Sequence, residues 1–244
     1  MIAGRVPWVD TQGERACLPG VDRGLEEELL RHHPAPGGTC LSALRACRAY
    51  GQPAANNSKG CRTIMRVAPV AFMTPRDQVR QLALRTSALT HGHPTGQCAV
   101  AFWAELIAEI WEGHTFTEID TADGRAAAQE LTEEYRLIPE ANEVAIAASQ
   151  ALASDRADPL SIEALGDGWT AETALAISLR ACCVADNFEN GLRIAVTHGG
   201  GSDSAGAIAG NLLGLIFSKE IFNHPWHKDV EGIDLLDGLI ALVK

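Results

Sequence analysis

The feature that most constrains the fold of this chain is an apolar pattern of helical period that follows Pro94 and Thr95. Apolar side chains recur there three and four residues apart, which places them on one face of an α-helix. They are Ala99, Phe102, Trp103, Leu106, Ile107 and Ile110. Gly113 and His114 then end the helix. The pattern therefore predicts one long helix with an apolar face.

More helices are expected along the rest of the chain, whereas period-two alternation, the mark of a strand, is scarce. The expected helices are Gly24–His32, Cys40–Ala46 with Thr39 as its cap, Gln78–Thr90, Thr121–Leu137, Glu143–Ala153, Thr170–Ala185, Phe188–Val196, Ala207–Phe217 and Ile233–Val243. No internal repeat and no low-complexity linker divides the sequence. We therefore expect an all-α fold in which residues 1–244 form a single compact helical domain.

Composition excludes several classes of protein. The net charge of −11 argues against a nucleic-acid binder and is compatible with an acidic pocket for divalent cations. The seven cysteines are odd in number and contain no Cys-x-x-Cys pair, so reduced thiols in a cytoplasmic protein are expected. No signal segment is seen at the start, and the longest apolar runs are too short for a bilayer, so no membrane association is expected.

A glycine-rich loop at Thr197–Gly206 is the strongest candidate site. Its three consecutive glycines allow close approach of a ligand or a neighbouring helix. The side chains of Ser202, Asp203 and Ser204 suit hard cations, and free amides at a helix start suit phosphates. The alternative, which is the commoner role of such a run, is a simple helix cap. No Lys follows to make a phosphate-binding P-loop, and no Gly-x-Ser-x-Gly elbow accompanies the glycines.

Four blocks in the same order resemble the ADP-ribosylglycohydrolase family. They are Asn56–Pro69, which ends in Met-Arg-Val-Ala-Pro; Thr90–Gly96, with its Thr-His element; Gly168–Glu172; and Thr197–Leu213, which is similar to a Gly-Asp-x-Asp-Ser/Thr signature. The resemblance implies an all-α hydrolase with a two-metal site, usually Mg²⁺. Such an enzyme cleaves the N- or O-glycosidic bond of ADP-ribosyl or related ligands. The implied partners are ADP-ribose-like small molecules or ADP-ribosylated proteins.

The resemblance also assigns residues. Asp203 and Ser204 would be metal ligands, with Asp203 as the catalytic carboxylate. His91 would face the distal part of the ligand. The remaining ligand-binding candidates lie in the first block and the glycine loop: Asn57, Ser58, Gly60, Cys61, Arg62, Thr63, Gly200, Gly201 and Ser202. Those at 60–63 would offer backbone amides to the diphosphate.

This sequence departs from the family pattern in three ways. It begins downstream of the Gly-Asp-Ala and Thr-Asp-Asp elements that supply metal ligands in the family, so we expect an N-terminally shortened form. Gly201 stands where the signature has its first Asp, and Arg62 stands where the ligand loop usually has glycine. Mg²⁺ usually takes one or two carboxylates, and Asp203 alone would hold two dications poorly. Arg62 is either a substitute partner for the diphosphate or a solvated loop charge.

Other residues have simpler alternatives. Glu172 is either buried behind the site or, as is commoner, a favourable charge at a helix start. Trp103, Trp111 and Trp169 are expected to pack in the core or between helices. His93 is expected to be structural, and Asn56, Asn57 and Ser58 are alternatively turn formers. Cys98 is expected to be a buried packing thiol.

Three hypotheses for the whole chain follow. The first is a divergent hydrolase of ADP-ribosyl ligands with an incomplete metal site. The second is a catalytically inactive relative that binds ADP-ribose-like ligands or serves as a scaffold. The third is a homodimer in which subunits complete each other's site and cover apolar surface.

Overall fold

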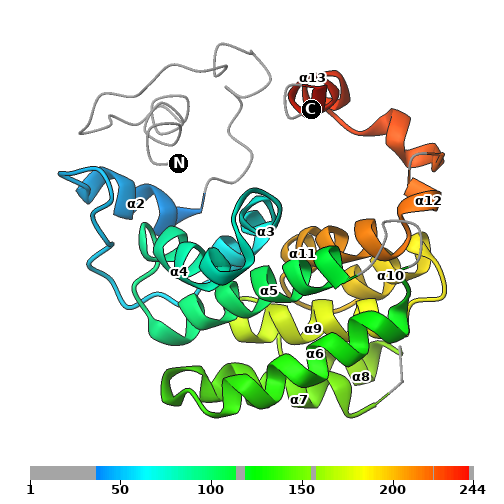
Figure 1. Ribbon diagram of the computed structural model, residues 1–244, viewed down its shortest axis with the longest axis horizontal. Helices are drawn as coiled ribbons and strands as arrows, with labels where there is room; N and C mark the ends of the chain where they lie inside the picture. Colours follow the sequence, from blue (N-terminus) through cyan, green and yellow to red (C-terminus); the bar gives the residue numbers. More distant parts are fainter. Residues whose placement is uncertain (1–36, 114–118, 155–157, 222, 242–244) are drawn as a thin grey trace.

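The computed structural model describes residues 37–113, 119–154, 158–221 and 223–241. The helix expected at Gly24–His32 lies outside this part of the chain. The secondary structure described is helical, and its one strand-like pairing is an isolated bridge between Gly60 and Thr170. The prediction of an all-α fold is therefore confirmed (Figure 1).

The longer helices match the sequence pattern. The α-helices are α2 (Gly38–Ala46), α3 (Ala68–Met73), α4 (Val79–Ala88), α5 (Pro94–Gly113), α6 (Thr121–Arg136), α7 (Asn142–Leu152), α8 (Pro159–Glu163), α9 (Ala171–Val184), α10 (Phe188–Val196), α11 (Ser202–Ile216), α12 (Ser218–Ile221) and α13 (Ile233–Ala241). The 3₁₀ helices are η2 (Cys61–Arg66), η3 (Arg76–Gln78), η4 (Pro139–Ala141) and η5 (Pro225–Asp229). Among the described residues, no helix is both long enough and apolar enough to cross a bilayer.

Helix α5 forms the centre of the bundle. It lies between α3 and α4 on one side and α6 and α7 on the other (Figure 1). The predicted face, which includes Phe102, Trp103 and Leu106, is fully buried. Val100, Ala104 and Ala108 on other faces are buried too, so partners surround the helix. Burial of each large side chain contributes about 1.5–3 kcal/mol, which makes this helix the main anchor of the core.

Helices α9 and α11 pack closely enough for side chains to bond across to backbone. The hydroxyl of Ser178 donates to the carbonyl oxygen of Ala205 at 3.1 Å, and the thiol of Cys182 lies 3.6 Å from the carbonyl oxygen of Ala209. Helix α10 packs on another face of α11, where a β-carbon on Gly206 would lie 2.7 Å from a methyl group of Val196. Small residues on α11 therefore set its close packing, and this fixes where its N-terminus lies.

Two predicted helix starts are wrong. Helix α2 begins at Gly38 with Gly37 as its cap, so Thr39 lies inside the helix. Helix α11 begins at Ser202, five residues before the predicted Ala207. The polar residues and the glycine of segment 202–206 predict a loop. Packing against α9 and α10 compensates for the low intrinsic helix propensity of that segment.

Candidate ligand site

Asn56 fixes the path of the first family block. Its Oδ1 accepts hydrogen bonds from the amides of Ser58 and Gly92 at 3.0 and 3.1 Å, and its Nδ2 donates to the carbonyl of Thr90 at 2.9 Å. The predicted turn-forming role is thus confirmed for Asn56. The same side chain joins the first block to the Thr-His block. Gly92 is needed here because a β-carbon would overlap the carbonyl oxygen of Asn56.

The segment 59–61 pairs with the turn before α9 in a short antiparallel arrangement. The amide of Cys61 donates to the carbonyl of Trp169 at 3.1 Å, and the amide of Ala171 donates to the carbonyl of Lys59 at 2.8 Å. The bridge between Gly60 and Thr170 lies between these two bonds. The third family block is thereby held directly against the first.

The turn at 166–168 carries the glycine loop. Gly166 and Gly168 have φ values of 118° and 73°, a region that favours glycine. The amide of Gly201 donates to the carbonyl of Asp167 at 2.8 Å, and Gly200 packs directly on that carbonyl. These contacts are made by backbone, and the carboxylate of Glu163 adds a side-chain contact by accepting the amide of Gly199 at 3.2 Å.

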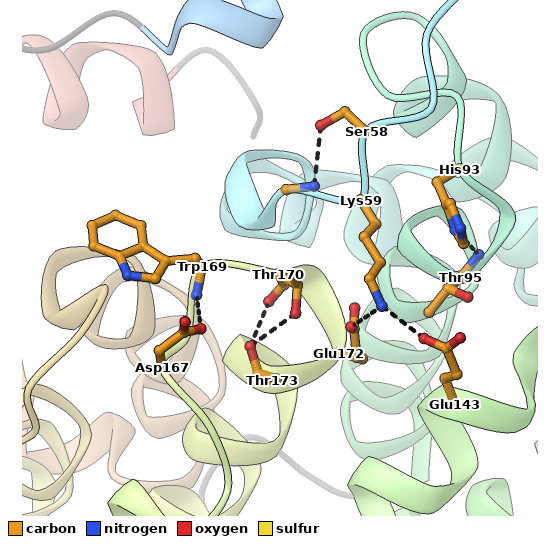
Figure 2. A network of polar contacts seen from close by, with 11 residues as sticks. Ser58, Lys59, His93, Thr95, Glu143, Asp167, Trp169, Thr170, Glu172 and Thr173 are labelled. Carbon is orange, nitrogen blue, oxygen red and sulfur yellow. Dashed lines mark hydrogen bonds and ion pairs between the residues drawn. The ribbon is translucent and has the colours of Figure 1, made fainter.

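Trp169 projects from this turn and is 58% exposed. Its amide donates to Oδ1 of Asp167 at 3.1 Å, as Figure 2 shows, while the indole ring is not packed in the core. The prediction that this residue packs in the core or between helices is wrong, because its backbone is held by the pairing of 59–61 with 169–171 while its ring remains exposed. Trp103 is fully buried as expected, and Trp111 is 40% exposed and stacks edge-on to Phe72. The sequence signal for Trp169 was its place inside a family block.

The start of α11 closes the group of segments. The N-cap Gly201 makes no side-chain cap bond, and the hydroxyl of Ser202 donates backwards to the carbonyl of His198 at 3.0 Å. The alternative reading of this run as a side-chain cap is therefore not supported. Asp203 is exposed, whereas Ser204 is buried; its hydroxyl donates to Oδ1 of Asp203 at 3.5 Å and also interacts with the thiol of Cys61. The first block thus touches the fourth.

Burial shifts the pKa of two titratable groups in these segments. Burial raises the pKa of the Cys61 thiol, and the hydrogen bond with Ser204 opposes this effect. The thiol is therefore protonated at neutral pH. Burial lowers the pKa of His198, and the carboxylates of Glu163 and Asp167 oppose that change. Both ring nitrogens of His198 are buried and have no hydrogen-bond partner among the described residues.

His91 lies beneath the first block. It is 1% exposed, and a β-carbon on Gly60 would be 3.2 Å from its Nε2. Its Nδ1 is 2.9 Å from the hydroxyl of Thr90, which also accepts a 2.7 Å hydrogen bond from Arg66. The buried His91 ring thus packs against the segment at Gly60. His93 accepts from the amide of Thr95 at the start of α5, as expected of a structural residue.

The structure thus brings all four family blocks together. Gly60, Cys61 and Ser204 lie at the meeting point, with Gly200, Gly201 and Ser202 beside them. Asn57 is exposed, Arg62 is half-buried with its side chain against Gly37, and Thr63 is buried. Among the amides at 60–63, that of Gly60 is bonded to the Ser58 hydroxyl at 3.3 Å and that of Cys61 to the carbonyl of Trp169. The amide of Thr63 is used within the 3₁₀ helix that begins at Cys61, so that of Arg62 is the one that could serve a phosphate.

The described residues do not form a two-metal site. Of these residues, no three His, Cys, Asp or Glu side chains are grouped so that they could hold a metal. Asp203 offers a carboxylate at the meeting point, but the hydroxyl of Ser204 is engaged with Cys61 and the carboxylate of Glu172 with Lys59. Mg²⁺ requires near-octahedral oxygen coordination, which this set does not supply.

The described residues form a helical bundle in which the segment 59–61, the turn at 167–171 and the start of α11 converge. This arrangement is that of an all-α protein with a candidate ligand site formed by loops. Comparison with family models identifies the class: the model of the ADP-ribosylglycohydrolase family matches residues 3–244. The chain belongs to this family, whose members are hydrolases that act on ADP-ribosylated substrates and for which a divalent metal is expected. Comparison with individually curated proteins gave no significant match.

Proposed function

We propose that this protein binds ADP-ribosyl ligands where the four blocks meet and hydrolyses their N- or O-glycosidic bond. The observation that carries the proposal is the convergence of the segment 58–63, the turn at 167–171 and the start of α11 on one place. The family match gives the chemical class of the ligand.

The residues suit separate parts of such a ligand. The exposed indole of Trp169 offers a flat surface on which a base or ribose can stack. The amide and the guanidinium of Arg62 suit the diphosphate. The exposed carboxylate of Asp203, in the first turn of α11, can accept hydrogen bonds from ribose hydroxyls or from an attacking water.

Calorimetry with ADP-ribose, in the presence and absence of Mg²⁺, tests this proposal. Binding by the wild-type chain and its loss in Asp203→Ala is the expected result, with a fall in affinity of about tenfold or more for a lost charged hydrogen bond. Asp186→Ala is the matched control, because Asp186 is exposed and outside the meeting point. Absence of ADP-ribose binding under both conditions would reject the assignment.

One observation favours a second function, a ligand-binding protein without turnover. The described residues at the meeting point form no metal cluster, and the carboxylate assigned to catalysis, Asp203, is paired with no cationic side chain among the ion pairs of the described residues. Release of ADP-ribose from an ADP-ribosylated protein distinguishes the two functions. Turnover that disappears in Asp203→Ala supports the hydrolase, whereas binding without turnover, with or without Mg²⁺, supports the inactive relative.

A further inference from the structure

Lys59 joins three elements through a single ammonium group. Its Nζ lies 2.5 Å from Oε1 of Glu172 in the first turn of α9 and 2.7 Å from Oε2 of Glu143 in the first turn of α7. Figure 2 shows the Lys59 side chain directed toward these two carboxylates and away from Trp169. The side chain is therefore not placed to contact a ligand that stacks on Trp169.

The two ion pairs differ in strength because their burial differs. The side chain of Glu172 is 10% exposed, whereas that of Glu143 is 54% exposed. Water screens the exposed pair with Glu143, so this pair contributes little to stability. The other oxygen of Glu172, Oε2, is buried and has no hydrogen-bond partner among the described residues. Lys59 is thus the cation that compensates a buried carboxylate, and its removal would leave that charge uncompensated.

The backbone of Lys59 is held as firmly as its side chain. Its carbonyl accepts the amide of Ala171, and the next residue, Gly60, forms the bridge with Thr170. On the opposite side, a β-carbon on Gly96 would lie 3.0 Å from the α-carbon of Lys59. The first turn of α5 and the start of α9 therefore enclose this residue, and any shift of Lys59 moves the amides that follow it.

We propose that Lys59 is a positioning residue of the ligand site: its ion pair with buried Glu172 fixes the segment 60–63 at the distance from Trp169 and Asp203 at which a ligand is bound. This inference rests on the proposed function for the identity of the ligand. It assigns to Glu172 a role that combines both sequence-based alternatives, since this carboxylate lies in the first turn of a helix and is also buried behind the loop.

The test uses the full chain with Lys59→Met, Glu172→Gln and two controls. Lys59→Arg keeps the charge, and Glu143→Gln removes only the exposed partner. The measurements are calorimetric affinity for ADP-ribose and amide hydrogen exchange of residues 60–63 in the ligand-free protein. Lys59→Met and Glu172→Gln are each expected to weaken binding by about tenfold or more and to speed exchange at 60–63 relative to α11. Lys59→Arg and Glu143→Gln are expected to stay within about threefold of wild type.

The double variant Lys59→Met/Glu172→Gln separates positioning from plain stability. Replacing both members of a buried pair is often neutral for stability, so its melting temperature is expected to return toward wild type. Exchange at 60–63 is expected to stay fast and binding to stay weak. Three results would each overturn the proposal. The first is recovery of the melting temperature, the exchange rate and the affinity together in the double variant. The others are an unchanged exchange rate in Lys59→Met and an effect of Glu143→Gln as large as that of Glu172→Gln. Because exchange needs no ligand, a chain that fails to bind ADP-ribose rejects the proposed function while the positioning role is still tested.

Discussion

Gly200 lies against the carbonyl oxygen of Asp167 so closely that a β-carbon has no room, and the neighbouring Gly201 amide bonds to that same carbonyl. Gly200→Ala is therefore expected to displace the glycine loop and to lower the free energy of unfolding by about 1–3 kcal/mol, the range for overpacking. It should also weaken ADP-ribose binding. Urea unfolding and calorimetry measure the two effects.

Gly199→Ala is the matched control for that substitution. A β-carbon on Gly199 would meet only the side-chain Oε1 of Glu163, at an ordinary 3.4 Å. We expect no loss of stability there, since alanine also restricts the unfolded chain. Equal losses in both variants would show that the contact with Asp167 does not position the loop.

The half-buried guanidinium of Arg62 gives a second prediction. If it pairs with the diphosphate, Arg62→Met will weaken ADP-ribose binding by about tenfold or more, and raising the salt concentration will weaken wild-type binding more than that of the variant. Calorimetry at two salt concentrations measures both effects. Arg136→Met is the control, since Arg136 is exposed on α6 and outside the meeting point. Unchanged affinity in Arg62→Met would show that Arg62 is a solvated loop charge and not a partner of the diphosphate.

A buried network between α5 and α6 predicts a dependence of stability on pH. The hydroxyl of Tyr135 donates to Oε2 of Glu105 at 2.5 Å, and burial, followed by the charge of Glu105, raises the pKa of Tyr135 well above its usual value. Since the folded-state pKa is above the unfolded value of about 10, the stabilising contribution is complete below about pH 10 and is lost as the pH rises further.

Tyr135→Phe removes this contribution. The loss is expected to be about 1.5–3 kcal/mol at neutral pH, as for a hydrogen bond to a charged group, and the gap between wild type and variant should narrow above about pH 10. Urea unfolding at neutral and alkaline pH measures it. Tyr50→Phe, at a residue that is 52% exposed, should change stability little at either pH. A gap that widens with pH would contradict the assigned direction of the shift.

Arg180 of α9 provides a prediction about stability alone. This residue is 3% exposed, and its guanidinium donates to the carbonyls of Gln150 and Ala151 at the end of α7, the first of these bonds measuring 2.7 Å. Arg180→Met leaves both carbonyls without these donors, at about 1–3 kcal/mol for the buried carbonyl of Ala151 and less for that of Gln150, which is only partly buried. Thermal unfolding should therefore show a large fall in melting temperature. A change no larger than that of Arg136→Met would contradict this role.

What the sequence predicted well was local. The periodic pattern of α5 and the bounds of α10 follow from side-chain spacing over one helix, and the structure has them as predicted. The start of α11 was misplaced because its first turn is stabilised by contacts with other helices. The exposure of Trp169 and the burial of Glu172 depend on the pairing of the turn before α9 with the segment 59–61. No local sequence pattern predicts that pairing.

The candidate site was predicted as separate blocks, and its geometry was not. The bridge between Gly60 and Thr170 and the ion pair of Lys59 with Glu172 join residues far apart in the sequence. Periodicity and motif spacing hold no information on such pairs. The resemblance to a family supplied the list of segments, whereas the structure showed which atoms connect them.

The bridge between Gly60 and Thr170 has a consequence for how the molecule folds. Its formation, and that of the contact between Cys61 and Ser204, requires closure of loops that span much of the chain, so the entropy of loop closure delays both until the helices have packed. The ligand-binding surface would then be among the last parts to form and among the first to open. A ligand that bridges these segments would slow unfolding more than it speeds folding, so its presence would be read most directly in the unfolding rate.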